Sequence, residues 1–295
     1  MIYIFAENDA VKAEDNKLIT KTLNGDRRAL EELIKRHQNW IYNIALRMVM
    51  LPEDAEDVTQ EILIKMVTRL STFKGNSDFR TWLYRIAANH VIDMKRKKAE
   101  QFFCSFESYG HGIDNTPDSN LPNPNELPVD ENLIVEETKL ECISGMLLCL
   151  DRKKRLTFIL GAIFAVSDKT GSEVLGISRD NFRKQLSRGR QKILNFMNER
   201  CSLINEHNSC RCRLKAKALI DQGIIDPENL RFTRMGAEKI KNIAKTKSEE
   251  FQDLVETKCI GIFRNMPFME SPDYVKVFRE IIDTNEFEKI FNLNN

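Results

Sequence analysis

The stretch from Glu53 to Lys98 constrains the fold of this chain more than any other part of the sequence. Pro52 precedes it, and Pro suits the first position of a helix because its φ is fixed near the helical value. The carboxylates of EDAED follow, and negative charge stabilises a helix N-terminus. Apolar residues then recur at spacings of three and four, which predicts one buried helix face. That face carries Ala55, Val58, Ile62 and Met66, and the other carries Asp57, Gln60, Glu61 and Ile64.

A second helix is predicted after a short loop. The break from Lys74 to Ser77 contains Gly and Asn, which are common turn residues. The helical pattern that follows ends in a cationic run from Lys95 to Lys98. Its expected buried residues are Phe79, Trp82, Leu83, Ile86, Ala87 and Val91. The simplest interpretation is an acidic face that binds a protein partner and a basic edge that binds a polyanion.

The residues before this pair predict further helices. Asp26 is a suitable N-cap, and a helical period of apolar residues then continues to Met50. A shorter helix is expected from about Asn16 to Leu23. His37 and Trp40 lack a nearby polar constellation in the sequence, so we interpret both as packing or helix-surface residues and not as binding groups.

The segments EDAEDVTQEILIKM and FKGNSDFRTWLYRIAANHVIDMKRKK resemble the promoter-melting region of bacterial RNA polymerase sigma factors, in the extracytoplasmic-function group of the sigma-70 family. The resemblance implies a loop pocket, Phe73 to Phe79, that holds an unpaired base of the −10 promoter element. The DNA-binding residues that it implies are Phe73, Lys74, Asn76, Ser77, Arg80, Arg85, Asn89, Lys95 and Arg96. It also implies that Asp57, Gln60, Glu61 and Ile64 contact the polymerase.

Composition changes sharply after Lys98. No Lys or Arg occurs from Ala99 to Thr138, where acidic residues accumulate among several prolines. Such a stretch has too little apolar surface for a core of its own, so we predict an extended linker. It could be a solvated tether; the resemblance instead implies an acidic connector that threads the polymerase cleft where RNA later runs.

A second basic helix is predicted from Arg179. It follows the short helical segment SDKTGSEVLGI, which turns at Gly176, and this order is typical of a helix-turn-helix. The alternative is a solvated basic helix face. SRDNFRKQLSRGRQKI also resembles the helix with which sigma factors read the −35 element, which implies the DNA-contacting residues Arg179, Asn181, Arg183, Lys184, Ser187 and Arg188. The sequence departs from the family at DKTG and at Leu51, where the family often has a capping Asp.

Three thiols and an imidazole lie just beyond this helix, at Cys201, His207, Cys210 and Cys212. Three interpretations stay open: unrelated reduced thiols, a structural zinc site, and a redox-sensitive pair. The Cys-x-Cys spacing is unusual for zinc, because common zinc knuckles separate their cysteines by two to four residues. An odd total of seven cysteines fits reduced thiols better than a secreted disulfide framework.

Composition and missing motifs exclude several classes of protein. No apolar run approaches the roughly 18 residues of a membrane span, and the N-terminus lacks the features of a signal peptide, so we expect a cytoplasmic protein. The net charge of +1 hides offsetting acidic and basic segments. The four histidines are scattered, and no Walker loop, GxGxxG, HExxH or GxSxG motif occurs, so we do not expect an enzyme.

We therefore predict an all-α protein with a promoter-melting domain at 1–98, an acidic linker at 99–138, a helix-turn-helix domain at 139–200 and a mainly helical extension at 201–295. The expected function is that of a sigma factor, with core RNA polymerase, promoter DNA and an anti-sigma protein as partners and no required cofactor. The rivals are a stand-alone helix-turn-helix regulator, and an interaction protein that sequesters another factor. The regulator would need neither the acidic helix nor the linker, and it would more often carry a dimerisation or ligand domain.

Overall fold

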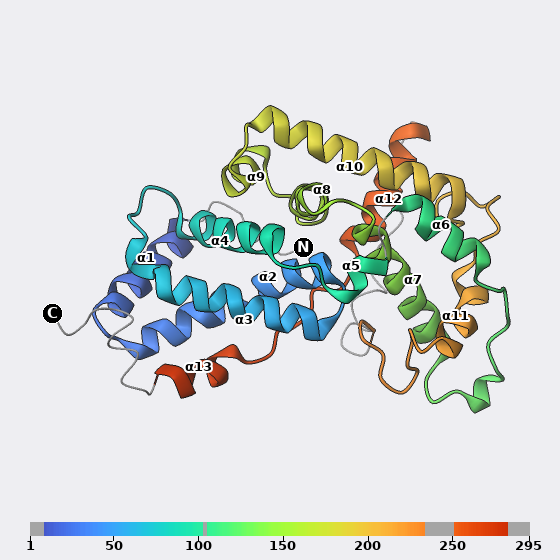
Figure 1. Ribbon diagram of the computed structural model, residues 1–295, viewed down its shortest axis with the longest axis horizontal. Helices are drawn as coiled ribbons and strands as arrows, with labels where there is room; N and C mark the ends of the chain where they lie inside the picture. Colours follow the sequence, from blue (N-terminus) through green and yellow to red (C-terminus); the bar gives the residue numbers. More distant parts are fainter. Residues whose placement is uncertain (1–8, 103–104, 234–250, 283–295) are drawn as a thin grey trace. The chain divides into compact units, whose positions relative to one another are not determined.

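The computed structural model describes residues 9–102, 105–233 and 251–282. These residues form helices and turns, with one isolated β-bridge and no strand (Figure 1). The chain divides into two compact units. Unit 1 contains Met1–Lys95, Phe164–Arg183 and Glu270–Asn295, and unit 2 contains Arg96–Ile163 and Lys184–Met269. Within the described ranges, no helix is both long enough and apolar enough to span a bilayer.

The core of unit 1 is a bundle of α1 (Asp9–Leu23), α2 (Arg27–Val49), α3 (Pro52–Arg69) and α4 (Phe79–Asp93). Helix α2 packs against α1 and along α3, with α4 against both α2 and α3 (Figure 1). The predicted apolar stripe of α3 is buried, from Ala55 to Met66. Trp40 and His37 are 2% and 3% exposed, which confirms that they are packing residues. Trp40 lies against the ring of Tyr84, with centroids 3.6 Å apart.

The capping residues explain where these helices begin. The Asp26 carboxylate accepts the backbone N–H groups of Arg28 and Ala29 at 3.0 and 3.1 Å, which confirms it as an N-cap. Asp78 caps α4 in the same way, by accepting the N–H of Arg80 at 3.1 Å. Leu51 provides no side-chain cap to α3, so Pro52 and the acidic first turn define its start.

Two later segments complete unit 1. Helix α9 (Asp168–Leu175) packs against α4, and α13 (Tyr274–Ile282) packs against α2. The Arg279 guanidinium makes a bidentate contact with Glu31 at 2.7 and 2.8 Å, and the Tyr274 hydroxyl donates to the Glu56 carbonyl at 3.1 Å. The C-terminal extension therefore contributes a helix to the same unit as the predicted promoter-melting domain. The extension is predicted to be mainly helical, with helical patterns at 237–255 and 274–290, and the parts of it at 234–250 and 283–295 lie outside the described residues.

Unit 2 is built around α7 (Glu131–Leu148) and α8 (Arg152–Phe158), which continues into a π-helical turn, η3 (Ile159–Ile163). Helix α11 (Cys212–Asp221) packs on α7, and α12 (Phe251–Arg264) packs on the π-helical turn. The long helix α10 (Arg179–Arg200) begins in unit 1 and continues in unit 2. Its Gly189 faces Phe158, where a Cβ would fit at 3.8 Å.

The prediction of an extended linker is wrong for much of 99–138. This stretch contains α5 (Lys98–Phe102), α6 (Phe106–Asn115) and a 3₁₀ turn, η2 (Pro124–Glu126), and α7 already begins at Glu131. The Tyr109 hydroxyl donates to the Cys142 carbonyl at 2.9 Å, so α6 is held on α7. Composition alone wrongly indicated a linker without packing of its own, because acidic residues of this stretch are buried against partners that are distant in the sequence.

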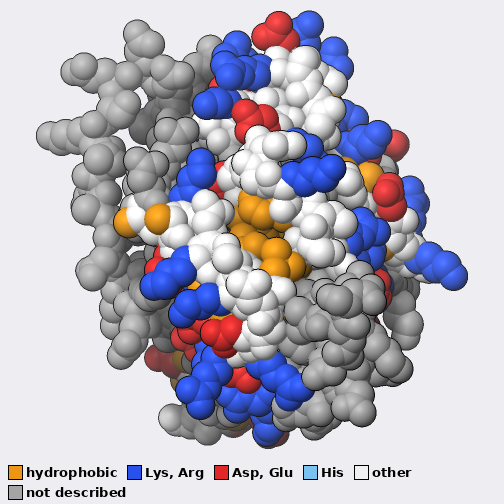
Figure 2. Space-filling view, turned by 90° about the vertical axis from the view of Figure 1, so that its left-hand side faces the viewer, with side chains coloured by type: hydrophobic (Ala, Val, Ile, Leu, Met, Phe, Trp, Pro, Cys, Tyr) orange, Lys and Arg blue, Asp and Glu red, His pale blue; other side chains and the backbone are white. Residues whose placement is uncertain are grey.

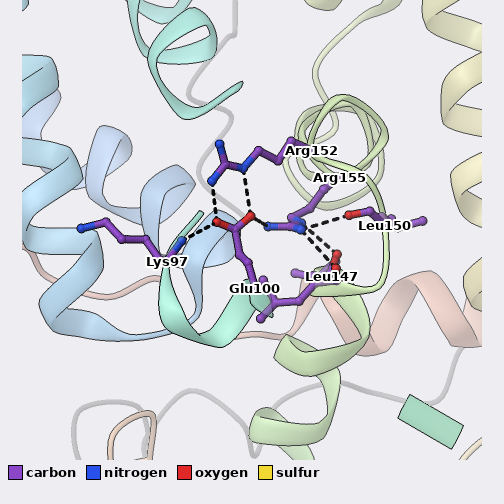
Figure 3. Close-up of polar contacts among 7 residues, drawn as sticks. Lys97, Glu100, Leu147, Leu150, Arg152 and Arg155 are labelled. Carbon is purple, nitrogen blue, oxygen red and sulfur yellow. Dashed lines mark hydrogen bonds and ion pairs between the residues drawn. The ribbon is translucent and has the colours of Figure 1, made fainter. Parts of the chain in front are cut away.

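Figure 3 shows one such partnership within unit 2. Glu100, 5% exposed, accepts hydrogen bonds from Arg152 at 2.9 and 2.6 Å and from Arg155 at 2.9 Å. Arg155 also donates to the carbonyls of Leu147, Leu148 and Leu150 at 3.0–3.1 Å, where α7 ends. Burial alone would raise the pKa of Glu100, but the hydrogen bond from Arg152 and the charge of Arg155 outweigh it and lower that pKa.

A second buried carboxylate fixes the extension to α7. Glu137, 1% exposed, accepts the backbone N–H groups of Arg231, Phe232 and Thr233 at 2.6–3.1 Å. One turn later, Glu141 accepts from the Arg231 guanidinium at 3.2 Å. Burial raises the pKa of Glu141 to about 7, an effect that Arg231 reduces and the Glu137 charge reinforces.

The raised pKa of Glu141 predicts a dependence of stability on pH. Folded protein should hold one more proton than unfolded protein between the ordinary pKa of 4.5 and about 7. The free energy of unfolding should therefore fall as pH rises through this window, by up to about 3 kcal/mol. Urea unfolding from pH 4.5 to 8 should show this slope reduced in Glu141→Gln and kept in Glu228→Gln, an exposed control. Equal slopes in both variants would contradict the prediction.

Candidate nucleic-acid interface

An aromatic cluster supports the loop between α3 and α4. A 3₁₀ turn, η1 (Leu70–Thr72), follows α3, and Phe73 then packs edge-on against Phe79 with ring centroids 5.4 Å apart. Trp82 stacks on Phe79 at 5.5 Å with planes inclined by 26°. Phe79 is buried, whereas Phe73 and Trp82 stay half-buried, so each has an accessible part. Half-exposed aromatic rings next to a loop can stack on nucleic-acid bases.

The loop itself carries polar side chains into solvent. Gly75 has φ +71°, a left-handed conformation that glycine adopts without strain. Of the residues predicted to contact the −10 element, one group is exposed: Lys74, Asn76, Arg85, Asn89, Lys95 and Arg96. Phe73, Ser77 and Arg80 are half-buried. Figure 2 shows one face of the molecule, on which Lys and Arg side chains gather around an apolar patch.

Two of the predicted DNA-binding arginines have protein partners. Arg80 lies 3.9 Å from the buried carboxylate of Asp15, which Arg36 also contacts at 2.9 Å. Arg85 donates twice to the Glu173 carbonyl of α9, at 3.1 and 2.7 Å. Both partners are distant in the sequence, so no local pattern could have indicated them. DNA would compete with these contacts for the two guanidinium groups.

The predicted polymerase-binding residues share the open face of α3. Asp57, Glu61 and Ile64 are exposed, and Gln60 is half-buried. Ile64 is 38% exposed and one of few large apolar side chains to be exposed in the described ranges. Glu61 approaches the His90 ring of α4 at 3.5 Å. An apolar side chain with polar groups around it has the arrangement of many protein interfaces, an apolar centre and a polar rim.

The two helices of the predicted helix-turn-helix are α9 and the start of α10, joined by a short turn. Helix α9 ends at Gly176, which has φ +64°, and the Ser178 hydroxyl then accepts the N–H of Asn181 at 3.2 Å. Gly171 packs directly on the ring of Phe182, which leaves no room for a Cβ. The close approach of α9 to α10 at this contact therefore favours glycine at position 171.

All six residues predicted to contact the −35 element are exposed on α10: Arg179, Asn181, Arg183, Lys184, Ser187 and Arg188. Phe182 faces the opposite way and is 1% exposed. Arg183 forms an ion pair with Asp168 of α9 and lies 3.6 Å from Asp180. The sequence analysis did not foresee the Asp168 partner, which DNA would have to replace.

Of the four predicted zinc ligands, the three cysteines line one small cavity and His207 does not. Cys201 is buried, Cys210 and Cys212 are half-buried, and His207 is exposed. Instead of His207, Cys142 of α7 shares an apolar cavity with the three cysteines. Among the residues that the structure describes, no group of three or more His, Cys, Asp or Glu side chains is placed to hold a metal ion. The sequence could not indicate that Cys142 joins these cysteines, because it lies on α7, far from them in the chain.

Comparisons with known proteins agree with the sequence motifs. The family model "Sigma-70 region 2" matches residues 33–101. The Bacillus subtilis protein "ECF RNA polymerase sigma factor SigW" is 30% identical over 178 residues, which cover 60% of this chain and 93% of that protein. The Mycolicibacterium smegmatis protein "ECF RNA polymerase sigma factor SigE" is 26% identical over 198 residues, or 65% and 73% of the two chains.

One solved structure is also similar, that of CnrH in complex with the cytosolic domain of CnrY. The match has a TM-score of 0.45 and 22% identity, and it covers 63% of this chain and 97% of the solved chain.

Proposed function

The chain belongs to the extracytoplasmic-function group of sigma-70 factors, and we propose that it binds core RNA polymerase and directs it to promoters with two separate DNA elements. The observation that carries this proposal is the joint presence of the aromatic-backed loop 73–78 and the exposed basic start of α10. The polymerase would supply the chemistry, and the role needs no cofactor. We also propose that it acts in the cytoplasm and that an anti-sigma protein controls it, and family membership supports both.

Promoter melting would work by base capture. Unstacking a base costs a few kcal/mol, and a pocket recovers this through stacking and hydrogen bonds. Phe73 and Trp82 offer the aromatic surface, and Asn76 and Ser77 offer donors and acceptors on the loop. Lys95 and Arg96 would neutralise phosphates near the captured strand. The exposed face of α3 leaves Ile64 and its polar neighbours available to the polymerase.

Recognition of the upstream element would use α10. A helix fits the major groove with its N-terminal residues against base edges, while flanking Arg and Lys contact phosphates. Asn181, Lys184 and Arg188 are exposed along this end of the helix. Arg183 would exchange its carboxylate partner Asp168 for DNA.

In vitro transcription tests the proposed function directly. Purified protein added to core polymerase should produce transcripts from specific promoters and none from unrelated DNA. The rival helix-turn-helix regulator would bind DNA but give no transcripts with core polymerase alone. Substituting Ile64→Glu, on the α3 face proposed to contact polymerase, should weaken association with core enzyme and leave the isolated protein folded, because this side chain is exposed.

The triple substitution Arg183→Ala, Lys184→Ala and Arg188→Ala should weaken promoter binding. Each lost base contact costs about 1–3 kcal/mol, and each lost phosphate contact lowers the log-log salt slope by about one unit. The measurement is binding of the polymerase complex to promoter DNA over a salt series. The control removes the same charge from exposed lysines elsewhere, Lys35, Lys258 and Lys276. Wild-type affinity and slope in the triple variant would refute this role of α10.

A further inference from the structure

Cysteines from three segments of unit 2 share one small cavity. The cavity measures about 20 Å³, and Cys142, Cys201, Cys210 and Cys212 contribute to its wall beside Phe196 and Met197. Cys142 comes from α7, Cys201 directly follows α10, Cys210 lies just before α11, and Cys212 is the first residue of α11. None of these four thiols is in a disulfide. The space is sufficient for about one water molecule, so no organic ligand fits between the thiols.

One pair among them has backbone geometry suited to a disulfide. Cys201 and Cys210 form an isolated parallel β-bridge, the only such bridge in the described residues. Bridged backbones lie about 4.8 Å apart, which is within the range of roughly 4.4–6.8 Å between Cα atoms in disulfides. Because both side chains line the same cavity, they lie on the same side of the bridge. The two sulfurs can therefore meet without movement of the backbone.

The loop between the two cysteines is held in place by its own side chains. The amide of Asn208 donates to the carbonyls of Asn198 and Cys201 at 3.0 and 3.3 Å, and that of Asn205 donates to Asn198 at 3.3 Å. The guanidinium of Arg211 donates to the Glu206 carbonyl at 2.9 Å. These bonds keep the ends of the loop together in the reduced protein.

Cys210 also borders a second cavity that is open and polar. This cavity measures about 300 Å³ and is lined by Asp114, Glu199, Arg200, Asn208, Ser209 and Cys210. Cys201, by contrast, is 8% exposed and lines the apolar cavity behind but not this open one. An oxidant in solution thus reaches Cys210 first, with Cys201 placed behind it.

We propose that Cys201 and Cys210 are a reversible oxidation site that closes into a disulfide at the junction between α10 and the C-terminal extension. In the first step the Cys210 sulfur attacks the distal oxygen of a hydroperoxide, the O–O bond breaks, and an alcohol leaves with the proton. Cys210 is then a sulfenic acid. In the second step the Cys201 sulfur attacks it, the S–O bond breaks, and the hydroxyl leaves as water with the Cys201 proton. Low-molecular-weight thiols reverse the reaction by exchange.

The disulfide would tie the extension to the last turn of α10. Cys201 immediately follows Arg200, the last residue of α10, and its N–H donates to the Met197 carbonyl at 2.8 Å. Cys210 stands just before α11, which packs on α7. Oxidation would thereby replace a connection held by amide hydrogen bonds with a covalent one, next to the helix proposed to read DNA.

Peptide mapping of the full-length protein tests this proposal. Trypsin cleaves after Arg200 and Arg211, so both cysteines fall in the single peptide CSLINEHNSCR. After treatment with hydrogen peroxide and alkylation, we expect this peptide two hydrogens lighter and without alkyl groups. Treatment with dithiothreitol before alkylation should restore two alkyl groups per peptide. The treatment should leave Cys142 and Cys259 alkylated.

Variants distinguish a disulfide between Cys201 and Cys210 from a disulfide with a neighbouring cysteine and from a zinc site. Cys201→Ser should abolish formation of the intramolecular disulfide, whereas Cys149→Ser, outside the shared cavity, should leave it unchanged. Linkage of CSLINEHNSCR to the dipeptide that starts at Cys212 would overturn the proposed pairing. One zinc per chain by elemental analysis, lost in Cys210→Ser, would also overturn it, because a metal would already hold these thiols. Circular dichroism verifies that each variant is folded.

Discussion

Replacing the loop residues 74–77 by a Gly/Ser segment should abolish formation of the open complex while leaving association with core polymerase intact. The structure sets the boundaries of this replacement. Asp78 is excluded because its carboxylate caps α4, and its loss would destabilise the start of that helix. Phe73 is also kept, because it packs on Phe79 and Trp82. The variant thereby removes the loop's side chains and retains its supports.

Permanganate reactivity of unpaired thymines measures the effect. Wild-type complexes should show reactive thymines at the −10 element, and the loop variant should show none. A matched control replaces the exposed turn Asp226–Asn229 of unit 2 by Gly/Ser, which should preserve reactivity. If the loop variant kept wild-type reactivity, the loop would have no part in melting. If instead the loop variant failed to bind core polymerase, the assignment of melting to the loop and of polymerase binding to the α3 face would be wrong.

The aromatic residues behind the loop show which features of the fold a sequence can predict. Phe79 and Trp82 were expected to be buried from their helical spacing, and Phe79 is. Trp82 stays half-buried because it stacks on Phe79 beside the loop and not inside the bundle. Periodicity indicates the face of a helix to which a residue belongs, but whether that face is fully covered depends on neighbouring segments.

The helices of unit 1 could be predicted because each has a local signal. Asp26 and Asp78 are capping residues, and α2 and α3 carry uninterrupted apolar periods. The helices within 99–138 could not be predicted in this way. Glu100 and Glu137 are stabilised by Arg152, Arg155 and the backbone of residues 231–233, and these partners are invisible in local composition. Acidic residues in a Pro-rich stretch were therefore interpreted as solvated.

For the candidate DNA-binding residues, too, local features could be predicted from the sequence and long-range partners could not. The exposure of those on α4 and α10 could be predicted from helical periodicity, which identified the buried face of α4 except at Trp82. Their ion pairs and hydrogen bonds could not, because Arg85 meets a carbonyl of α9, and Arg80 meets the carboxylate of Asp15. These contacts show that part of the proposed DNA-binding charge is already compensated within unit 1. Release of Arg85 from Glu173 would accompany its binding to phosphate.

The substitution Glu100→Gln should destabilise unit 2 by about 3–5 kcal/mol. The side chains of Glu100 and Arg155 are each 3% exposed, so removal of the carboxylate leaves a buried guanidinium without its counter-charge. Arg152, 14% exposed, loses the same partner but can rehydrate in part. Glu107→Gln, an exposed position on α6, should change the free energy of unfolding by less than about 0.5 kcal/mol. Urea unfolding at pH 7 measures both variants.

The dependence of this effect on pH identifies its origin. The folded-state pKa of Glu100 lies below its ordinary value of 4.5, so its stabilising contribution is complete above that pH. As pH falls through the folded-state pKa, the wild-type carboxylate takes up a proton and the contribution is lost. The difference between wild type and Glu100→Gln should therefore shrink at acidic pH. A difference that stayed constant with pH would mean that packing, and not charge, accounts for the lost stability.

Two substitutions of its arginine partners distinguish the contribution of the Glu100 ion pairs from that of the hydrogen bonds with which Arg155 supports the end of α7. Arg155→Met removes the counter-charge of Glu100 together with the donors to the carbonyls of Leu147, Leu148 and Leu150. Of the hydrogen bonds described above, Arg152→Met removes those to Glu100 and leaves the bonds to the three carbonyls in place. Because unpaired buried carbonyls add their own desolvation cost, we expect Arg155→Met to be the more destabilising by at least about 1 kcal/mol. Equal losses would show that water satisfies the end of α7 when the guanidinium is absent.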